Sequence, residues 1–212
     1  MMQQQTTTNN NTQKAINKNH GGHELFDLQE VLNCSISAMD QYMIFRQYAQ
    51  DQELLNLIDK QYQFMQSQYN LTAECFKTGQ EPSQKTSTYL IKEVTPTVFG
   101  IKQSSPKKPI QSLADVNDAG VCGFMQGIVK KHASLLTTSA LEATNPVVRR
   151  VLASQVQNFI EMSYELFLYQ NKNAYYQVPQ LNDADMQQIL NTFLPIAETP
   201  QMPESNKGTA LH

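Results

Sequence analysis

One long helix, expected over residues 146–173, constrains the fold of this chain more than any other segment. The pair Asn145-Pro146 marks its start, because an Asn side chain can cap a helix and Pro at the first helical position loses no needed donor. Residues that recur every three or four positions after this start indicate one buried face. They are Val148, Leu152, Gln155, Phe159, Met162, Leu166 and Tyr169. The aromatic pair Tyr175-Tyr176 follows the end of the pattern.

The same spacing predicts three more long helices, at about 23–48, 50–77 and 114–141. The expected buried stripe of the helix at 23–48 is Leu25, Leu28, Leu32, Ile36, Met39 and Met43. That of the helix at 50–77 is Leu54, Ile58, Tyr62, Met65, Tyr69, Thr72 and Phe76. That of the helix at 114–141 is Val121, Met125, Ile128, His132, Leu135 and Ser139. Gly79 is a stop signal after the second of these helices. Few residues separate the first helix from the second, so the two should form an antiparallel hairpin.

Residues 79–113 form a long connection rich in Pro, with short β-prone patches YLIKEV and TVFGI. A helix of about 26 residues is about 40 Å long. A linker of about 35 residues is long enough to return along that whole distance. We therefore expect an all-α chain with a ferritin-like four-helix bundle at 23–180, built from two antiparallel hairpins joined by a long crossover linker. A simple up-down-up-down bundle is the alternative.

The ends of the chain differ from the bundle in composition. Residues 1–22 are rich in Gln, Thr and Asn without apolar periodicity, which predicts a disordered tail. Residues 181–212 are expected to form an extension with one short helix at 183–193, capped by Asp183. The first residues lack the basic start and apolar centre of a signal peptide, so we expect the protein to stay in the compartment where it is made.

The composition excludes some classes of partner. A net charge of −3 and paired rather than clustered basic residues give no stripe for nucleic acid. No apolar run approaches the roughly 20 residues needed to cross a bilayer, so membrane insertion is not expected. Charged residues make up 17% of the chain, whereas Gln and Asn together make up roughly a fifth, so the polar helix faces should be rich in amides.

Cysteine and glycine have structural interpretations here. Cys34, Cys75 and Cys122 are odd in number and widely spaced, which argues against a disulfide framework and favours buried thiols. Gly120, Gly123 and Gly127 lie within the helix expected at 114–141, where small residues should let it approach a neighbouring helix closely. Motifs such as G-x-S-x-G, G-x-x-x-x-G-K-[ST], G-x-G-x-x-G and C-x-x-C do not occur.

A ferritin-like bundle raises the question of a di-metal centre, which needs inward carboxylates and Glu-x-x-His pairs. The sequence contains no Glu-x-x-His, and the helix at 146–173 has Glu161 and Glu165 without any histidine. We therefore predict no metal, cofactor or catalytic residues. The alternative is a metal-binding protein or oxidase with non-standard ligands.

Three histidines remain to be interpreted. His132 lies in an apolar stripe and is expected to be a hydrogen-bonded core residue, with metal binding as the alternative. Glu165 is expected to pair with His132 or with Arg149 of a neighbouring helix or subunit. The run containing His20 and His23 could bind a metal ion weakly, although a solvated junction is the preferred interpretation.

The run ALEATNPVVRRVLASQVQ, followed by YELFLYQNKNAYY, resembles the signature helices of the Coat F family of bacterial spore coat proteins. The matching positions are Asn145, Pro146, Arg149, Glu165, Leu166, Phe167 and Tyr176. The resemblance covers mainly residues 115–179, and the upstream run HGGHELFDLQEVL resembles longer members. Ala174 departs from the family's usual Gly, and Tyr175 from its frequent Trp, so the corner after the helix should differ in shape.

The resemblance implies a ferritin-like bundle and a structural role in the endospore coat. The expected partners are other spore coat proteins, with a homodimer as a further expectation. The expected location is the coat, after synthesis in the mother cell cytoplasm. A regulator that binds another protein in that cytoplasm is a third hypothesis, and cross-linking through Tyr, Gln or Lys side chains is a further one.

Overall fold

The structure is a computed structural model that describes residues 20–92, 95–196 and 199–201. Most of the tail expected at 1–22 lies outside the described residues, as does the end of the C-terminal extension. The chain divides into two compact units, at residues 1–178 and 179–212.

The described residues form helices joined by loops and extended segments. The first unit contains α1 (Gly22–Arg46), α2 (Gln52–Thr78), the one-turn 3₁₀ helix η1 (Leu113–Asp115), α3 (Asp118–Glu142) and α4 (Pro146–Lys172). The second unit contains α5 (Asp183–Leu190). The predicted bounds differ most at the start of α3, because η1 forms a separate turn before it, and at the end of α5.

Hydrogen bonds at the two ends of the bundle fix the directions of its helices. At one end the Tyr169 hydroxyl donates to Asp51 at 2.9 Å, and Asp118 accepts from the backbone N–H of Gln50 at 2.7 Å. This end therefore holds the starts of α2 and α3 and the end of α4. At the other end Asn145 donates to the carbonyl of Gly79 at 2.9 Å, which joins the start of α4 to the end of α2.

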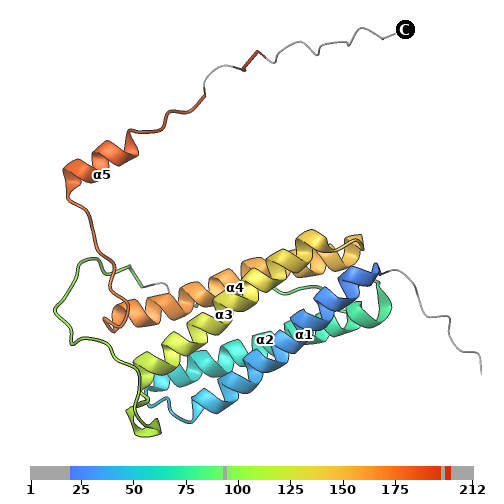
Figure 1. Ribbon diagram of the computed structural model, residues 1–212, viewed down its shortest axis with the longest axis horizontal. Coiled ribbons are helices and arrows are strands. Elements are labelled where there is room, and N and C mark those ends of the chain that lie inside the picture. The colour runs from blue at the N-terminus through green and yellow to red at the C-terminus, as the bar shows by residue number, and fades with distance from the viewer. Residues whose placement is uncertain (1–19, 93–94, 197–198, 202–212) are drawn as a thin grey trace, which may run out of the picture. The chain divides into compact units, whose positions relative to one another are not determined.

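Each helix is consequently antiparallel to both of its neighbours. Helices α1 and α4 run in one direction, and α2 and α3 in the other (Figure 1). The neighbouring pairs are α1 with α2, α3 with α4, α1 with α3 and α2 with α4. One long crossover between the second and third helices gives the connectivity of ferritin-like bundles, as the sequence predicts.

Helix ends follow the capping residues that the sequence contains. The Asn145 side chain accepts from Val147 N–H at 2.8 Å, so it caps α4 with Pro146 in the first turn. Gly79 ends α2 with a φ of 61°, a left-handed conformation that suits Gly. The prediction that Asp183 caps the last helix is wrong, because the cap is the preceding residue, Asn182.

The predicted buried faces differ in accuracy among the four helices. In α4 the whole predicted stripe is buried. In α2 and α3 about half of each stripe is buried and the rest is half-buried. The buried members are Leu54, Ile58, Met65 and Thr72 in α2, and Val121, Met125, His132 and Ser139 in α3.

The stripe predicted for α1 is only partly right, because Leu28 is buried and Leu32 and Met39 are half-buried. Leu25, Ile36 and Met43 are exposed. The buried face of the helix consists of Glu24, Leu28, Val31, Ser35, Ala38 and Tyr42. Apolar residues occur all round α1, so spacing alone did not select a face. Hydrogen bonds to the polar members of the buried face, described below, stabilise the orientation observed.

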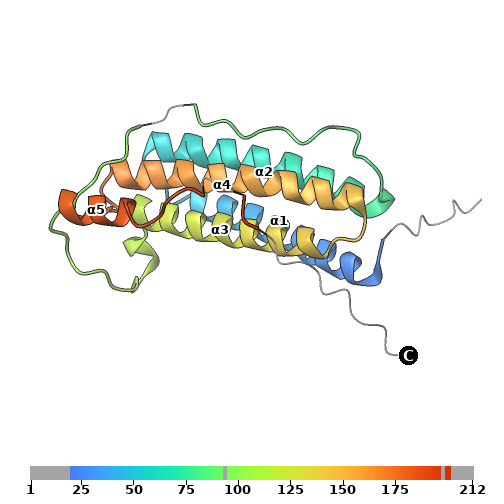
Figure 2. The same cartoon turned by 90° about the horizontal axis from the view of Figure 1, so that it is seen from above.

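The crossover linker returns along α2 and α4, as Figure 2 shows. The Tyr89 side chain is buried, and Asn158 of α4 accepts from the Tyr89 N–H at 2.9 Å. Further along, Asn171 accepts from the Val98 N–H at 2.7 Å and donates to the Val98 carbonyl at 3.0 Å. The described parts of the β-prone patches form no sheet, and Phe99 makes one isolated parallel bridge to Val178.

A hydrogen-bonded corner ends α4 and contains the only non-Gly residue with positive φ among those described. Ala174 has φ 58°, and its N–H donates to the carbonyl of Asn171 at 3.0 Å. The N–H of Tyr175 donates to the carbonyl of Gln170 at 2.8 Å. This pair of bonds is the Schellman arrangement, in which the left-handed position normally holds Gly. The corner therefore keeps a glycine-type geometry although the residue is Ala.

We expect Ala174→Gly to stabilise the protein by about 0.5 kcal/mol. An L side chain in the left-handed region costs roughly 1 kcal/mol, and the greater freedom of Gly in the unfolded chain offsets part of that gain. The control is Ala153→Gly, on the exposed side of α4, which should destabilise by about 1 kcal/mol. Urea unfolding measures both, and a loss of stability in Ala174→Gly would contradict the strain.

Candidate functional site

Amide side chains line much of the interior of the bundle. The buried ones are Gln61, Gln68, Gln126, Asn145, Gln155, Asn158, Gln170 and Asn171. Gln61 accepts from the Tyr42 hydroxyl at 2.6 Å and donates to the Met162 carbonyl at 3.0 Å, which links α1, α2 and α4. Many of the amides expected on polar outer faces are thus inside. The signal for this was Gln155, which lies within the apolar stripe of α4.

Two further amide contacts join α4 to its neighbours. Gln155 donates to the hydroxyl of Thr72 in α2 at 2.9 Å, and Gln170 donates to the side-chain oxygen of Gln126 in α3 at 3.1 Å. Neutral amides with internal partners avoid the large cost of burying charge. They also make poor metal ligands compared with carboxylates and imidazoles. No group of three or more His, Cys, Asp or Glu residues among the described positions could hold a metal ion.

His132 lies in the core of the bundle. Its exposed fraction is 1%, its Nε2 lies 3.4 Å from the Ser35 hydroxyl, and its ring lies 4.4 Å from that of Phe159. Burial lowers the pKa of His132 to about 4, so the ring is neutral at pH 7. The structure thus places His132 where the core interpretation expects it.

A second polar cluster surrounds the carboxylate of Glu24, whose exposed fraction is 1%. It accepts from Asn145 N–H at 2.6 Å and from the Thr144 hydroxyl at 2.9 Å, and His20 Nδ1 lies 2.5 Å away. Burial alone would raise the pKa of Glu24, but these hydrogen bonds outweigh it and the pKa lies below its ordinary value. The cluster ties the start of α1 to the loop between α3 and α4.

The two N-terminal histidines have different acidic partners. His20 contacts Glu24, whereas His23 is largely exposed and lies 3.2 Å from Asp27. The structure does not bring them together with a third ligand among the described residues. Weak metal binding by this run stays an untested alternative.

A third cluster holds the crossover linker against α2 and α4. Glu165 pairs with Lys60 Nζ at 2.7 Å and accepts a hydrogen bond from the Tyr89 hydroxyl. Within this chain, the prediction that Glu165 pairs with His132 or Arg149 is therefore wrong. Tyr89 of the linker is one partner of Glu165, and the path of the linker over the helices could not be predicted from local spacing. Burial, with the nearby Glu165 carboxylate, raises the pKa of Tyr89 far above its ordinary value, so the phenol stays protonated.

The cysteines are free thiols. Cys75 and Cys122 are buried, as predicted, and Cys34 is half-buried. Burial, together with nearby carboxylates, raises the thiol pKa of Cys75 to about 11 and that of Cys122 to about 12. Thiolate is the reactive form, so these two groups are suited to packing rather than to nucleophilic chemistry.

The prediction that the glycines of α3 let this helix approach a neighbouring helix closely is wrong. A Cβ placed at Gly123 or Gly127 would meet nothing within 4 Å, and both residues are exposed. Their spacing puts them on the outer side of α3 instead of against a neighbouring helix. They border hollows that meet at Phe124, one at the linker end of the bundle and one between α1 and α3.

We expect the stability of the protein to fall between pH 6.5 and 4 because of His132. The folded state keeps its pKa near 4, while the unfolded state takes up a proton near pH 6.5. The contribution of His132 to the free energy of unfolding is therefore fully present above pH 6.5. It falls by about 1.4 kcal/mol per pH unit as the pH decreases towards 4.

Urea unfolding at several pH values measures this slope, and His132→Met is the matched control. The variant keeps a large apolar side chain at the site and should have a shallower pH dependence. An identical slope in both proteins would show that His132 is not the group responsible.

Comparison with known proteins supplies the family. The Coat F domain model matches residues 117–179, from the cap of α3 to just beyond the corner after α4. The Bacillus subtilis (strain 168) protein named "Spore coat protein F-like protein YhcQ" is 54% identical over 188 residues, covering 89% of this chain and 86% of that protein.

A solved structure supports the fold. The crystal structure of a protein described as a spore coat protein, BH2358 of Bacillus halodurans C-125, matches with a TM-score of 0.55 and 17% sequence identity. The match covers 77% of this chain and 96% of that one. At this identity the likeness concerns the fold alone. The high identity to the Bacillus subtilis protein over most of both chains, with the domain match, shows that this chain belongs to the Coat F family.

Proposed function

We propose that this protein is a structural component of the bacterial endospore coat that acts through protein–protein assembly and has no catalytic centre. The observation that carries the proposal is the 54% identity, over 89% of the chain, to a relative named as a spore coat protein F-like protein. The proposed partners are other coat proteins and a second copy of this chain. The proposed route is synthesis in the mother cell cytoplasm followed by incorporation into the coat.

The interior of the bundle supports a structural role. Its polar groups are mostly amides that bond to hydroxyls, to backbone or, in one pair, to each other, and its buried thiols and the Tyr89 phenol have raised pKa values. Such groups stabilise a fold but are poorly suited to proton transfer or nucleophilic attack near pH 7.

The outer surface supports assembly. Helix α1 leaves Phe26, Met43 and Ile44 exposed at 71%, 63% and 53%. Exposed apolar side chains gathered on one element are typical of surfaces that bind other proteins. None of the helices among the described residues carries an apolar stretch long enough to cross a bilayer.

We expect a fluorescent fusion of the full chain to collect at the rim of the forespore and to remain on the mature spore. Microscopy during sporulation measures this, with the unfused fluorescent protein under the same promoter as control. A fusion that stays diffuse in the mother cell would contradict coat incorporation and favour the cytoplasmic regulator.

Metal analysis of the purified chain addresses the oxidase alternative, because stoichiometric iron or manganese would contradict a purely structural role.

A further inference from the structure

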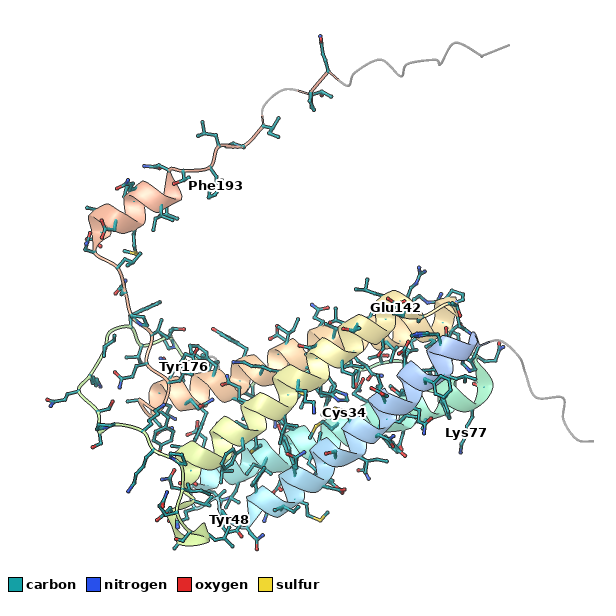
Figure 3. All side chains as sticks on the ribbon, in the orientation of Figure 1. Cys34, Tyr48, Lys77, Glu142, Tyr176 and Phe193 are labelled. Atoms are coloured by element: carbon teal, nitrogen blue, oxygen red, sulfur yellow. The ribbon has the colours of Figure 1, made fainter. Side chains whose placement is uncertain are left out.

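The second unit contains an apolar segment and no buried core of its own among the described residues. Residues 181–196, which we call the tail segment, contain α5, and no residue of α5 is buried. Six of its large apolar side chains are exposed at 54–86%: Leu181, Ile189, Leu190, Phe193, Leu194 and Ile196. Phe193 follows the end of α5 (Figure 3). A helix of eight residues is unstable alone in water, so this segment needs a surface to pack against.

The first unit offers a groove with matching properties. A hollow of about 860 Å³ lies among the linker at 101–110, the start of α3 and the corner after α4; we call it the corner groove. Its apolar lining includes Ile101, Ile110 and Phe124. Beyond Gly123 a second hollow of about 360 Å³ continues between α1 and α3.

The charges of the two surfaces are opposite. The tail segment contains two acidic residues, Asp183 and Asp185, and no basic ones. The corner groove is lined by Lys107 and Lys108. Its one acidic residue, Asp115, already accepts hydrogen bonds from the backbone of 111–112. The lysines of the corner groove and the acidic start of α5 are therefore complementary in charge, which favours steering and register when such surfaces bind.

We propose that the tail segment of one copy docks in the corner groove of a second copy. This inference deepens the assembly mechanism and rests on the proposed function for its biological setting. The two contacting surfaces are different parts of the chain, so the interface is heterologous. Such contacts either close into rings or continue as open chains, and both suit a protein that builds an extended shell.

The short connection between the units favours a second copy over the same chain. Four residues, 179–182, separate Val178 from α5, and an extended stretch of that length spans about 14 Å. Pro179 keeps Val178 extended, and Val178 also bridges to Phe99. The corner groove is itself lined by residues 174–177. The chain would have to reverse at once to lay its own α5 there.

Sedimentation velocity of the purified full chain over a range of concentrations tests the docking. We expect oligomers that grow with concentration and weaken with salt. Leu190→Asp with Phe193→Asp should make the protein monomeric, as should Lys107→Glu with Lys108→Glu. All four positions are exposed, so these changes should leave the bundle folded.

Two further variants separate docking from general surface effects. Leu141→Asp adds a charge at an 81% exposed apolar position near the end of α3, outside the groove, and it should leave association unchanged. Gly123→Leu fills the groove while replacing a helical glycine, so it should weaken association and raise the stability of the bundle. The variant with Lys107→Glu and Lys108→Glu should associate again when Asp183→Lys and Asp185→Lys are added, because the signs of both surfaces are then reversed.

Mixing experiments determine which copy is bound. In a Cys34→Ser background, chains carrying Ile189→Cys and chains carrying Ile110→Cys should form a mixed disulfide faster than either pairs with itself. A chain that is monomeric at all concentrations, or whose oligomers survive both double variants, overturns the proposal. A monomer that still enters the coat would overturn this inference alone, whereas oligomers with a diffuse fusion would overturn only the proposed function.

Discussion

Hydrogen bonds from the buried amides of α4 are the interaction on which the rest of the structure depends. Gln155 reaches α2, Gln170 reaches α3, and Asn158 and Asn171 hold the crossover linker through its backbone. Each buried amide left without its partner would cost about 1–3 kcal/mol, so a slip of one helix along another is penalised at several places together. The amides thus fix the register of a bundle whose apolar stripes alone would tolerate alternatives.

A neutral interior also has consequences for function. In a bundle of this connectivity, inward carboxylates and histidines would hold metal ions. Here most amides of the described interior bond to hydroxyls, to backbone or, in the pair Gln126–Gln170, to each other. The buried histidine is neutral, and the carboxylates Glu24 and Glu165 are held by hydrogen bonds and ion pairs. The exposed face of α1, the corner groove and the tail segment are the surfaces where binding is expected.

Local signals in the sequence predicted most of the fold, because caps and helical spacing act over a few residues. Helix α4 starts at its Asn145 cap and α2 ends at Gly79 where expected, and the α4 stripe is buried throughout. The face of α1 was missed because its apolar residues surround the helix. The partner of Glu165 was missed because it depends on where a long linker crosses the bundle. Ala174 was recognised as unusual, but its left-handed conformation needed the structure to be seen.

Urea unfolding of Asn158→Ala tests most directly the claim that α4 amides hold the bundle and its linker. Asn158 is 4% exposed, and its side chain accepts from Tyr89 N–H and donates to the Ser87 carbonyl, each at 2.9 Å. The substitution leaves the N–H of the buried Tyr89 unpaired and should lower the free energy of unfolding by about 2 kcal/mol. The exposed Asn56→Ala in α2 is the control and should change it little. If Asn158→Ala lowered the free energy of unfolding no more than Asn56→Ala, the claim that α4 amides hold the bundle and its linker would be contradicted.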